Sequence, residues 1–139
     1  MTRFVIDASV ALCWYLERQK TEFTESVLNR LAEGDEGCAP AIWPLEMVNA
    51  LTISCRQKAI TADQLEMFIL DVKDLPVEID AGGISRSYSS VFRLCRAHQL
   101  SSYDAAYLDL AQIEAIPLAT LDKNLRTAAK AAGVRLLTS

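Results

Sequence analysis

Short apolar stretches that alternate with longer segments of helical spacing constrain the fold of this chain more than any other feature. The stretches that have the length and apolar content of buried strands are residues 3–7, 37–40, 76–79, 117–121 and 134–137. Parallel strands need crossover connections, and these are usually helices that cover both faces of the sheet. We therefore predict an α/β fold, a three-layer α/β/α sandwich with a mostly parallel central sheet.

The segments between these stretches carry helix signals. Pro44 is suited to a first helical turn, Thr61 and Gln64 form a capping-box pattern, and Gly133 is suited to the position after a last turn. The expected helices span residues 8–16, 22–32, 84–99, 102–115 and 122–132, and two more open at positions 44 and 61. No linker, repeat or low-complexity tract divides the chain, so residues 1–139 are expected to form a single domain.

Composition narrows the class of protein. No apolar run approaches the roughly 18 residues of a membrane-spanning helix, and Asp7 interrupts the first apolar run too early for a secretory signal. We expect a cytoplasmic protein. The four cysteines form no C-x-x-C pair and His98 is the only histidine, which favours buried thiols over a zinc site.

The formal charge of −4 argues against a protein that grips nucleic acid through a broad basic surface. It leaves a nuclease open, because carboxylates gathered around metal ions count as acidic in the composition while presenting a cationic centre to a phosphate.

Four acidic residues occupy positions that a parallel sheet would bring together. Asp7 and Asp122 each follow a predicted strand directly, and Glu46 and Asp104 fall in the first turns of two helices. Strand-to-helix junctions of a parallel sheet lie at its carboxyl edge, where ligands bind in a crevice. The four acids are therefore expected to converge there.

All four acids have apolar neighbours in the sequence, so their convergence would cost free energy through lost hydration and mutual repulsion. A bound cation would offset that cost. Oxygen ligands alone favour a hard ion such as Mg²⁺ or Mn²⁺. Helix capping is the alternative for each acid taken singly, since acids are favoured at helix starts.

Polar residues near the acids are candidates for a supporting shell. Ser9 follows Asp7 by two positions, Asn49 lies one helical turn beyond Glu46, and Thr120 precedes Asp122 by two. For each, a purely structural hydrogen bond is an equal alternative.

Basic residues elsewhere in the sequence are candidates for contacts with RNA. Two sets have helical spacing on one face: Arg86, Arg93 and Arg96, and Lys123, Arg126 and Lys130. Solvated helix faces are the favoured interpretation of both. Asp109 is likewise interpreted as a solvated surface residue.

At the four acids the sequence resembles the PIN-domain family, and within it the VapC-type toxins of toxin–antitoxin pairs. The resembling segments are Val5-Ile-Asp-Ala-Ser-Val10, Pro44-Leu-Glu-Met-Val-Asn-Ala-Leu51, Leu100-Ser-Ser-Tyr-Asp-Ala-Ala-Tyr-Leu108 and Leu118-Ala-Thr-Leu-Asp-Lys-Asn-Leu125. They supply the family's acids in order along nearly the whole chain.

The resemblance implies a metal-dependent endoribonuclease that uses Mg²⁺ or Mn²⁺, forms a homodimer and is blocked by a cognate antitoxin. It also implies roles for the acids: Asp7, Asp104 and Asp122 as metal ligands, and Glu46 as a ligand or a nearby base. In-line hydrolysis of RNA, with a 5′-phosphate and a 3′-hydroxyl as products, is the expected reaction.

Two other functions remain as alternatives. A phosphotransfer protein would carry a phosphorylated Asp7, but such sites commonly need a second acid beside the first, and Ala8 and Ser9 supply none. A catalytically inactive PIN-like module that binds RNA or a protein is the main alternative, and it has little reason to keep all four acids.

Overall fold

The computed structural model describes residues 2–138 and contains a parallel sheet at its centre. The strands are β1 (Arg3–Ile6), β2 (Glu36–Pro40), β3 (Val77–Asp80) and β4 (Leu118–Ala119). Every pairing is parallel, and the order across the sheet is β3-β2-β1-β4. The predicted parallel sheet is confirmed.

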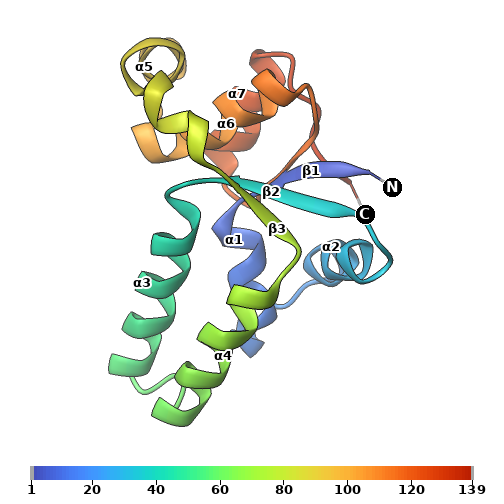
Figure 1. Ribbon diagram of the computed structural model, residues 1–139, viewed down its shortest axis with the longest axis vertical. Helices are drawn as coiled ribbons and strands as arrows, with labels where there is room; N and C mark the ends of the chain where they lie inside the picture. Colours follow the sequence, from blue (N-terminus) through green and yellow to red (C-terminus); the bar gives the residue numbers. More distant parts are fainter. Residues whose placement is uncertain (1, 139) are drawn as a thin grey trace.

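Helices cover both faces of this sheet. The α-helices are α1 (Ala8–Ala11), α2 (Glu22–Ala32), α3 (Trp43–Arg56), α4 (Ala62–Asp74), α5 (Phe92–His98), α6 (Ser102–Glu114) and α7 (Lys123–Ala131). In Figure 1, α5, α6 and α7 lie above the sheet and α1 to α4 lie below it, with α3 and α4 projecting downward side by side. The predicted three-layer α/β/α sandwich is confirmed.

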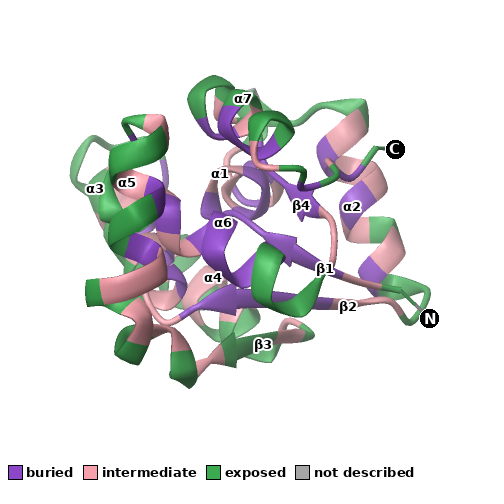
Figure 2. Cartoon of the chain, turned by 90° about the horizontal axis from the view of Figure 1, so that it is seen from above, coloured by how far each residue is buried: buried purple, intermediate pink, exposed green. Residues whose placement is uncertain are grey.

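The sheet carries the core of the molecule. Phe4, Val5 and Ile6 of β1 are fully buried, as are Leu118 and Ala119 of β4. Figure 2 shows β1, β2, β4 and the helix α6 as largely buried, whereas the edge strand β3 and the outer helices carry exposed residues. Burial on both faces explains why β1 and β4 are continuous apolar runs instead of alternating patterns.

The strand order fixes where a ligand site can form. The chain runs outward from β1 through β2 to β3, then returns to place β4 on the other side of β1. Neighbouring strands whose connections leave in opposite directions open a crevice at their carboxyl ends. In this protein that point lies between β1 and β4, the strands that Asp7 and Asp122 follow.

Two expected helices are shorter than predicted. The segment expected as a helix over residues 8–16 is α-helical only over Ala8–Ala11 and then tightens into a 3₁₀ turn, η1 (Leu12–Trp14). A further 3₁₀ turn, η2 (Glu17–Gln19), follows. The indole of Trp14 donates a 2.7 Å hydrogen bond to the carbonyl oxygen of Thr24, which draws the chain toward α2.

The segment expected as a helix over residues 84–99 is α-helical only over Phe92–His98. It begins with a 3₁₀ helix, η3 (Ala81–Arg86), and a π-helical turn, η4 (Ser87–Val91). Arg86 there donates from Nε to Asp109 at 2.7 Å and from Nη2 to Asp80 at 3.1 Å. These contacts between distant residues are absent from the local sequence pattern.

The last expected strand, residues 134–137, is reduced to one parallel bridge between Leu118 and Leu136. Hydrogen bonds from Leu118 N to Arg135 O and from Leu137 N to Leu118 O hold it beside β4. Among the described residues, no helix is long and apolar enough to cross a membrane.

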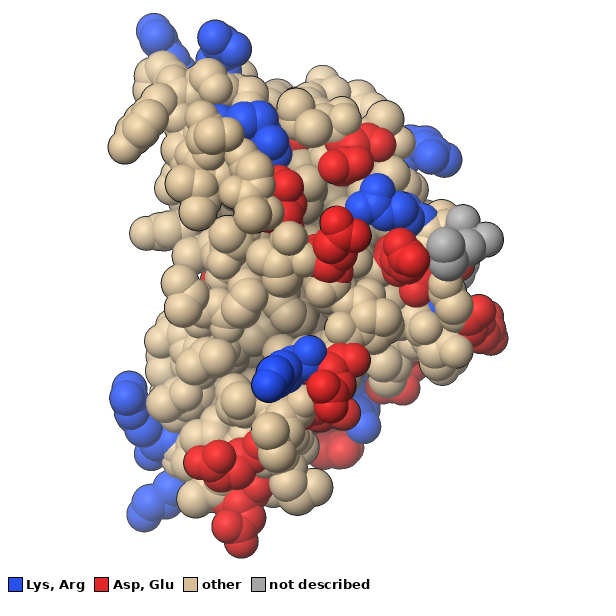
Figure 3. Space-filling view, viewed as in Figure 1, with Lys and Arg blue, Asp and Glu red and all other residues tan. Residues whose placement is uncertain are grey.

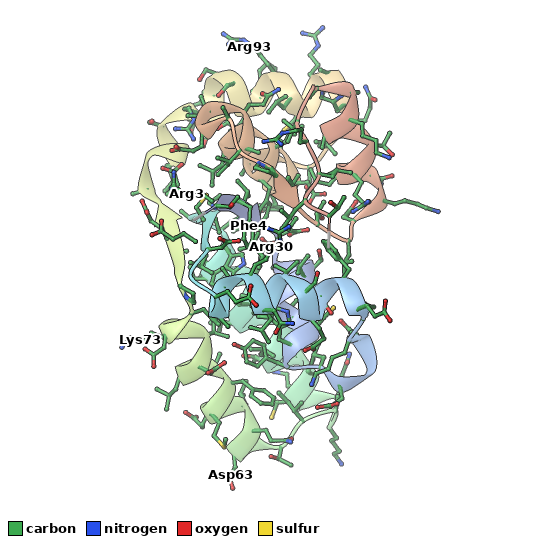
Figure 4. The ribbon with its side chains drawn as sticks, turned by 90° about the vertical axis from the view of Figure 1, so that its right-hand side faces the viewer. Arg3, Phe4, Arg30, Asp63, Lys73 and Arg93 are labelled. Atoms are coloured by element: carbon green, nitrogen blue, oxygen red, sulfur yellow. The ribbon has the colours of Figure 1, made fainter. Side chains whose placement is uncertain are left out.

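A cluster of ion pairs lies at the amino edge of the sheet. Figure 4 views the molecule from that side, with Arg3 and Phe4 of β1 labelled. The guanidinium of Arg3 lies 3.4 Å from a carboxylate oxygen of Glu114 and 3.8 Å from oxygens of both Glu36 and Glu78. Acids at this edge therefore share a cation that the protein itself supplies.

Candidate active site

The four acids singled out in the sequence meet at the carboxyl edge of the sheet. Asp7, Glu46, Asp104 and Asp122 line one cavity of about 340 Å³. The remaining residues of its lining are Ala8, Ser9, Leu12, Asn49 and Ala50. Side chains from four separate parts of the chain are thus brought to one place by the strand order.

Asp7 is the most buried of the four acids, with only 6% of its surface exposed. It directly follows β1 and precedes α1. Its Oδ2 accepts hydrogen bonds from Thr120 Oγ1 at 2.7 Å and from Ser9 Oγ at 2.9 Å. Burial raises the pKa of this carboxyl, the two hydroxyls lower it, and the charge of Asp122 raises it again.

The same two hydroxyls tie β1 to the segment after β4. Thr120 Oγ1 also accepts from the backbone N–H of Asp122 at 3.0 Å, and Ser9 Oγ accepts from that of Leu121 at 3.1 Å. Asp122 then caps α7, because its Oδ1 accepts from the N–H of Leu125 at 3.0 Å. One hydrogen-bonded network therefore fixes the positions of Asp7 and Asp122.

Glu46 reaches the cavity from the first turn of α3, which opens at Trp43 and Pro44. Its Oε1 accepts a hydrogen bond from the hydroxyl of Tyr107 on α6. Burial raises the pKa of Glu46, the Tyr107 hydroxyl lowers it, and the charges of Asp7 and Asp104 raise it. Tyr107 itself is fully buried, and its position one helical turn after Asp104 is the one sequence signal that could have indicated this contact.

Asp104 lies in the first turn of α6, where the Ser101 hydroxyl accepts from its backbone N–H at 3.1 Å. Its side chain therefore does not cap the helix. Burial raises the pKa of the Asp104 carboxyl, and the charges of Asp122 and Asp7 raise it further. The charges of these acids thus act on one another across the cavity.

Unlike the acids around Arg3, these four have no ion-pair partner among the side chains that the structure describes, which exclude that of Arg18. Carboxylates from several elements around one cavity, without a described protein cation beside them, match the donor chemistry of a hard divalent ion. Within the described chain, however, no three His, Cys, Asp or Glu side chains stand close enough together to hold one metal ion. The fit to a metal therefore rests on donor type and charge.

The polar residues expected around the acids fall into two groups. Ser9 and Thr120 bind Asp7 directly, whereas Asn49 lines the cavity without a side-chain hydrogen bond to the described residues. Arg126 donates to the carbonyl oxygen of Thr120 at 3.0 Å, so it supports the loop that carries Asp122.

The interpretation of Asp109 as a solvated surface residue is wrong. Asp109 is 1% exposed and accepts hydrogen bonds from Arg86 Nε and the Ser90 hydroxyl. Arg86 consequently belongs to a buried ion pair and does not form a free basic face with Arg93 and Arg96. Figure 4 shows Arg93 at one extreme of the long axis, far from β1.

Comparison with known proteins agrees with this architecture. The sequence model of the PIN domain matches residues 4–131. The chain belongs to the PIN-domain family. No curated protein matches it at a significant level.

Solved structures show the same PIN fold at low sequence identity. VapBC2 from Rickettsia felis, bound to a DNA fragment from its promoter, superposes with a TM-score of 0.67 at 14% identity and covers 98% of each chain. FitAcB from Neisseria gonorrhoeae gives 0.66 at 14% identity, covering 97% of this chain and 96% of that one. A toxin–antitoxin complex from Klebsiella pneumoniae gives 0.59 at 13% identity, covering 85% of each.

Proposed function

We propose that this PIN domain is a metal-dependent endoribonuclease and the toxin of a type II toxin–antitoxin system. The observation that carries the proposal is the convergence of Asp7, Glu46, Asp104 and Asp122 on one cavity without a protein cation. The fold shared with structures named as toxin–antitoxin complexes supports the biological setting. The whole chain is taken as one nuclease domain.

The proposed metal ligands are Asp7, Asp104 and Asp122, with Glu46 as a further ligand or as a base that accepts a proton from water. A bound Mg²⁺ or Mn²⁺ would activate water, orient the scissile phosphate and neutralise charge on the leaving oxygen. Carboxylates without such an ion would repel the phosphate. The cation is therefore needed for binding RNA as well as for cleaving it.

The residues of this chain have distinct tasks in the proposed reaction. Thr120 and Ser9 hold Oδ2 of Asp7, which directs the remaining oxygen toward an ion. Tyr107 holds Oε1 of Glu46 in the same way, and the other oxygen is left to accept a proton. The expected products are a 5′-phosphate and a 3′-hydroxyl, and a cyclic phosphate among the products would contradict this mechanism.

The proposal includes partners and a location. A cognate antitoxin would block the cavity, the toxin would be a homodimer, and both would act in the cytoplasm, where RNA is the substrate. Exposed apolar side chains at Ile84, Tyr88 and Phe92 provide a surface on which a second protein chain could pack.

The experiment that tests the proposal is cleavage of total cellular RNA by the purified protein with Mg²⁺ or Mn²⁺. Two controls accompany it: EDTA removes the metal ion, and the variant Asp104→Asn replaces one proposed ligand with a side chain of the same size. We expect cleavage that both controls abolish. Equal cleavage by Asp104→Asn would show that the acids do not carry the activity.

The alternative of an inactive PIN-like binding module is favoured by one observation, the absence of a ready-made ligand group for a metal within residues 2–138. A metal titration separates the two functions. Binding of Mn²⁺ to the native protein and loss of that binding in Asp104→Asn would support the nuclease, and absence of binding would support the module.

A further inference from the structure

A second cavity adjoins the acidic one along α3. It has a volume of about 640 Å³ and shares Glu46 and Asn49 with the acidic cavity. Its other lining residues are Ile42, Leu45, Val48, Thr52, Arg56 and Tyr103. We call this set of residues the α3 trough. It begins at the acids and extends toward the far end of the helix.

The near end of the α3 trough is aromatic and apolar. Tyr103 is 60% exposed and immediately precedes Asp104 on α6. Leu45 is 66% exposed and immediately precedes Glu46 on α3. An exposed tyrosine beside an acidic cavity offers a flat face on which an unstacked base can lie.

The far end of the α3 trough is polar and basic. Asn49, Thr52 and Arg56 follow one another along α3, with Arg56 as its last residue. Ten residues of helix separate Arg56 from Glu46, a distance of about 15 Å. Arg56 is exposed and forms no ion pair with the residues the structure describes.

The charge pattern of this side of the molecule agrees with an anionic strand. Figure 3 shows Lys and Arg side chains at the upper and lower ends of its left-hand edge, with mostly uncharged surface between them. In the same view α3 descends along the lower left. A polyanion that leaves the acidic cavity along α3 therefore moves from repulsive charge toward attractive charge.

We propose that the α3 trough binds the single-stranded RNA next to the scissile phosphate. A base stacks on Tyr103, and Arg56 contacts a phosphate farther along the strand. This inference rests on the proposed function, because the acidic cavity is taken as the cleavage site. Continuity with that cavity and the unpaired cation at Arg56 favour RNA over a second protein chain.

Binding and cleavage must be measured separately to test this. Binding is measured with all four acids intact, by fluorescence anisotropy with a short labelled single-stranded RNA of randomised sequence. Ca²⁺ replaces Mg²⁺ and Mn²⁺ in this measurement, because it binds the same oxygen ligands and its less rigid coordination supports little hydrolysis. We expect Tyr103→Ala to weaken binding roughly 5- to 100-fold, and Tyr103→Phe to retain it, because phenylalanine keeps the stacking face. The matched control is Ile113→Ala, which removes another exposed apolar side chain from α6.

The contribution of Arg56 is measured by the salt dependence of RNA binding. Arg56→Ala should lower the slope of log affinity against log salt by about 0.7, the contribution of one phosphate contact on a single strand, while Arg56→Lys should keep it. Arg135→Ala, which removes an exposed arginine that lines a different cavity, is the control and should leave the slope unchanged.

The outcomes separate the two proposals. Metal-dependent cleavage by the native protein, together with unchanged RNA affinity and salt slope in Tyr103→Ala and Arg56→Ala, would overturn the trough and leave the nuclease intact. If Tyr103→Ala left the RNA affinity unchanged but changed the oligomeric state in solution, the α3 trough would instead be a contact between two copies of this protein. Absence of both cleavage and RNA binding in the native protein would overturn the proposed function itself, and the trough with it.

Discussion

Each of two acids at the candidate site has one oxygen held by a buried or half-buried hydroxyl. Thr120 and Ser9 hold Asp7, and Tyr107 holds Glu46. These bonds favour the ionised carboxylates and oppose the burial that raises their pKa values. The hydroxyls thus act against the protonation of these two partly buried acids.

Tyr107→Phe tests that role at the residue scale. The substitution removes the hydroxyl and keeps the ring, so Glu46 loses both its orientation and a bond that lowers its pKa. We expect RNA cleavage to fall about 10- to 100-fold, the usual cost of losing a partner of a metal ligand. The acidic limb of the pH–rate profile should move to higher pH, because the pKa of Glu46 rises further.

The pH profile distinguishes positioning from packing. A purely structural tyrosine would, when changed to Phe, alter stability or overall rate without moving the acidic limb. An unmoved limb in Tyr107→Phe would therefore show that the hydroxyl does not govern the ionisation of Glu46. Tyr15→Phe is the matched control, since the Tyr15 hydroxyl donates to Asp71, outside the site.

At the scale of single elements, the sequence was informative wherever a local rule decides the structure. The capping-box pattern at Thr61 does start α4, and the helix predicted over 22–32 is α2. The prediction of a continuous α-helix from residue 84 was wrong at its start, where Arg86 donates hydrogen bonds to Asp80 and Asp109. The four acids lie together because β4 pairs with β1. The sequence indicates that order only indirectly, through the alternation of predicted strands and helices.

Asp122 shows why capping and catalysis could not be separated from sequence. It caps α7 through Leu125 and also lines the acidic cavity. Asparagine caps helices about as well as aspartate, whereas alanine does not. We expect Asp122→Asn to abolish cleavage with little loss of stability, and Asp122→Ala to abolish cleavage and lower the free energy of unfolding by about 1 kcal/mol.

Urea unfolding followed by circular dichroism measures these stabilities, and cleavage of total RNA measures the activity. Full activity in Asp122→Asn would mean that the residue only caps α7. A loss of stability in Asp122→Asn equal to that in Asp122→Ala would mean that the cap depends on its charge.

The ion pair between Arg86 and Asp109 joins the η3–η4 segment to α6. Asp109 is almost fully buried and Arg86 is 23% exposed at the side chain. Removing one partner leaves the other charge uncompensated, which costs about 3–5 kcal/mol in buried pairs. We expect that loss in Arg86→Ala, and a smaller loss in the double variant Arg86→Ala, Asp109→Ala than the sum of the two single losses. Additive losses in urea unfolding would contradict a direct interaction.

At the scale of the whole molecule, the two edges of the sheet differ in how their acids are neutralised. The amino edge has Arg3 between three glutamates, and the carboxyl edge has four acids without a described ion-pair partner. The carboxyl edge therefore carries an electrostatic cost, which the proposed cation would relieve. The alternation of strands and helices in the sequence predicted the sheet. It could not show that the negative charges at the amino edge are neutralised by Arg3.

A divalent cation should consequently stabilise the folded protein. A ligand that binds only the folded state adds about 2.7 kcal/mol at a concentration 100 times its dissociation constant. For a domain of this size, a gain of that order raises the melting temperature by roughly 5–15 °C. We expect Mn²⁺ or Mg²⁺ to produce such a rise in thermal unfolding, and EDTA to reverse it.

The variant Asp104→Asn assigns that rise to the carboxyl edge. Asn removes one negative charge and keeps the size of the side chain, so the metal-free variant should melt at or above the temperature of the metal-free native protein, and Mn²⁺ should raise it little further. The equivalent substitution at the amino edge is Glu114→Gln. It should leave the response to Mn²⁺ intact, because Glu114 pairs with Arg3 and lies away from the acidic cavity. If native protein and Asp104→Asn responded equally to Mn²⁺, the ion would be binding elsewhere, and the acids at the carboxyl edge would have to bear their repulsion without it.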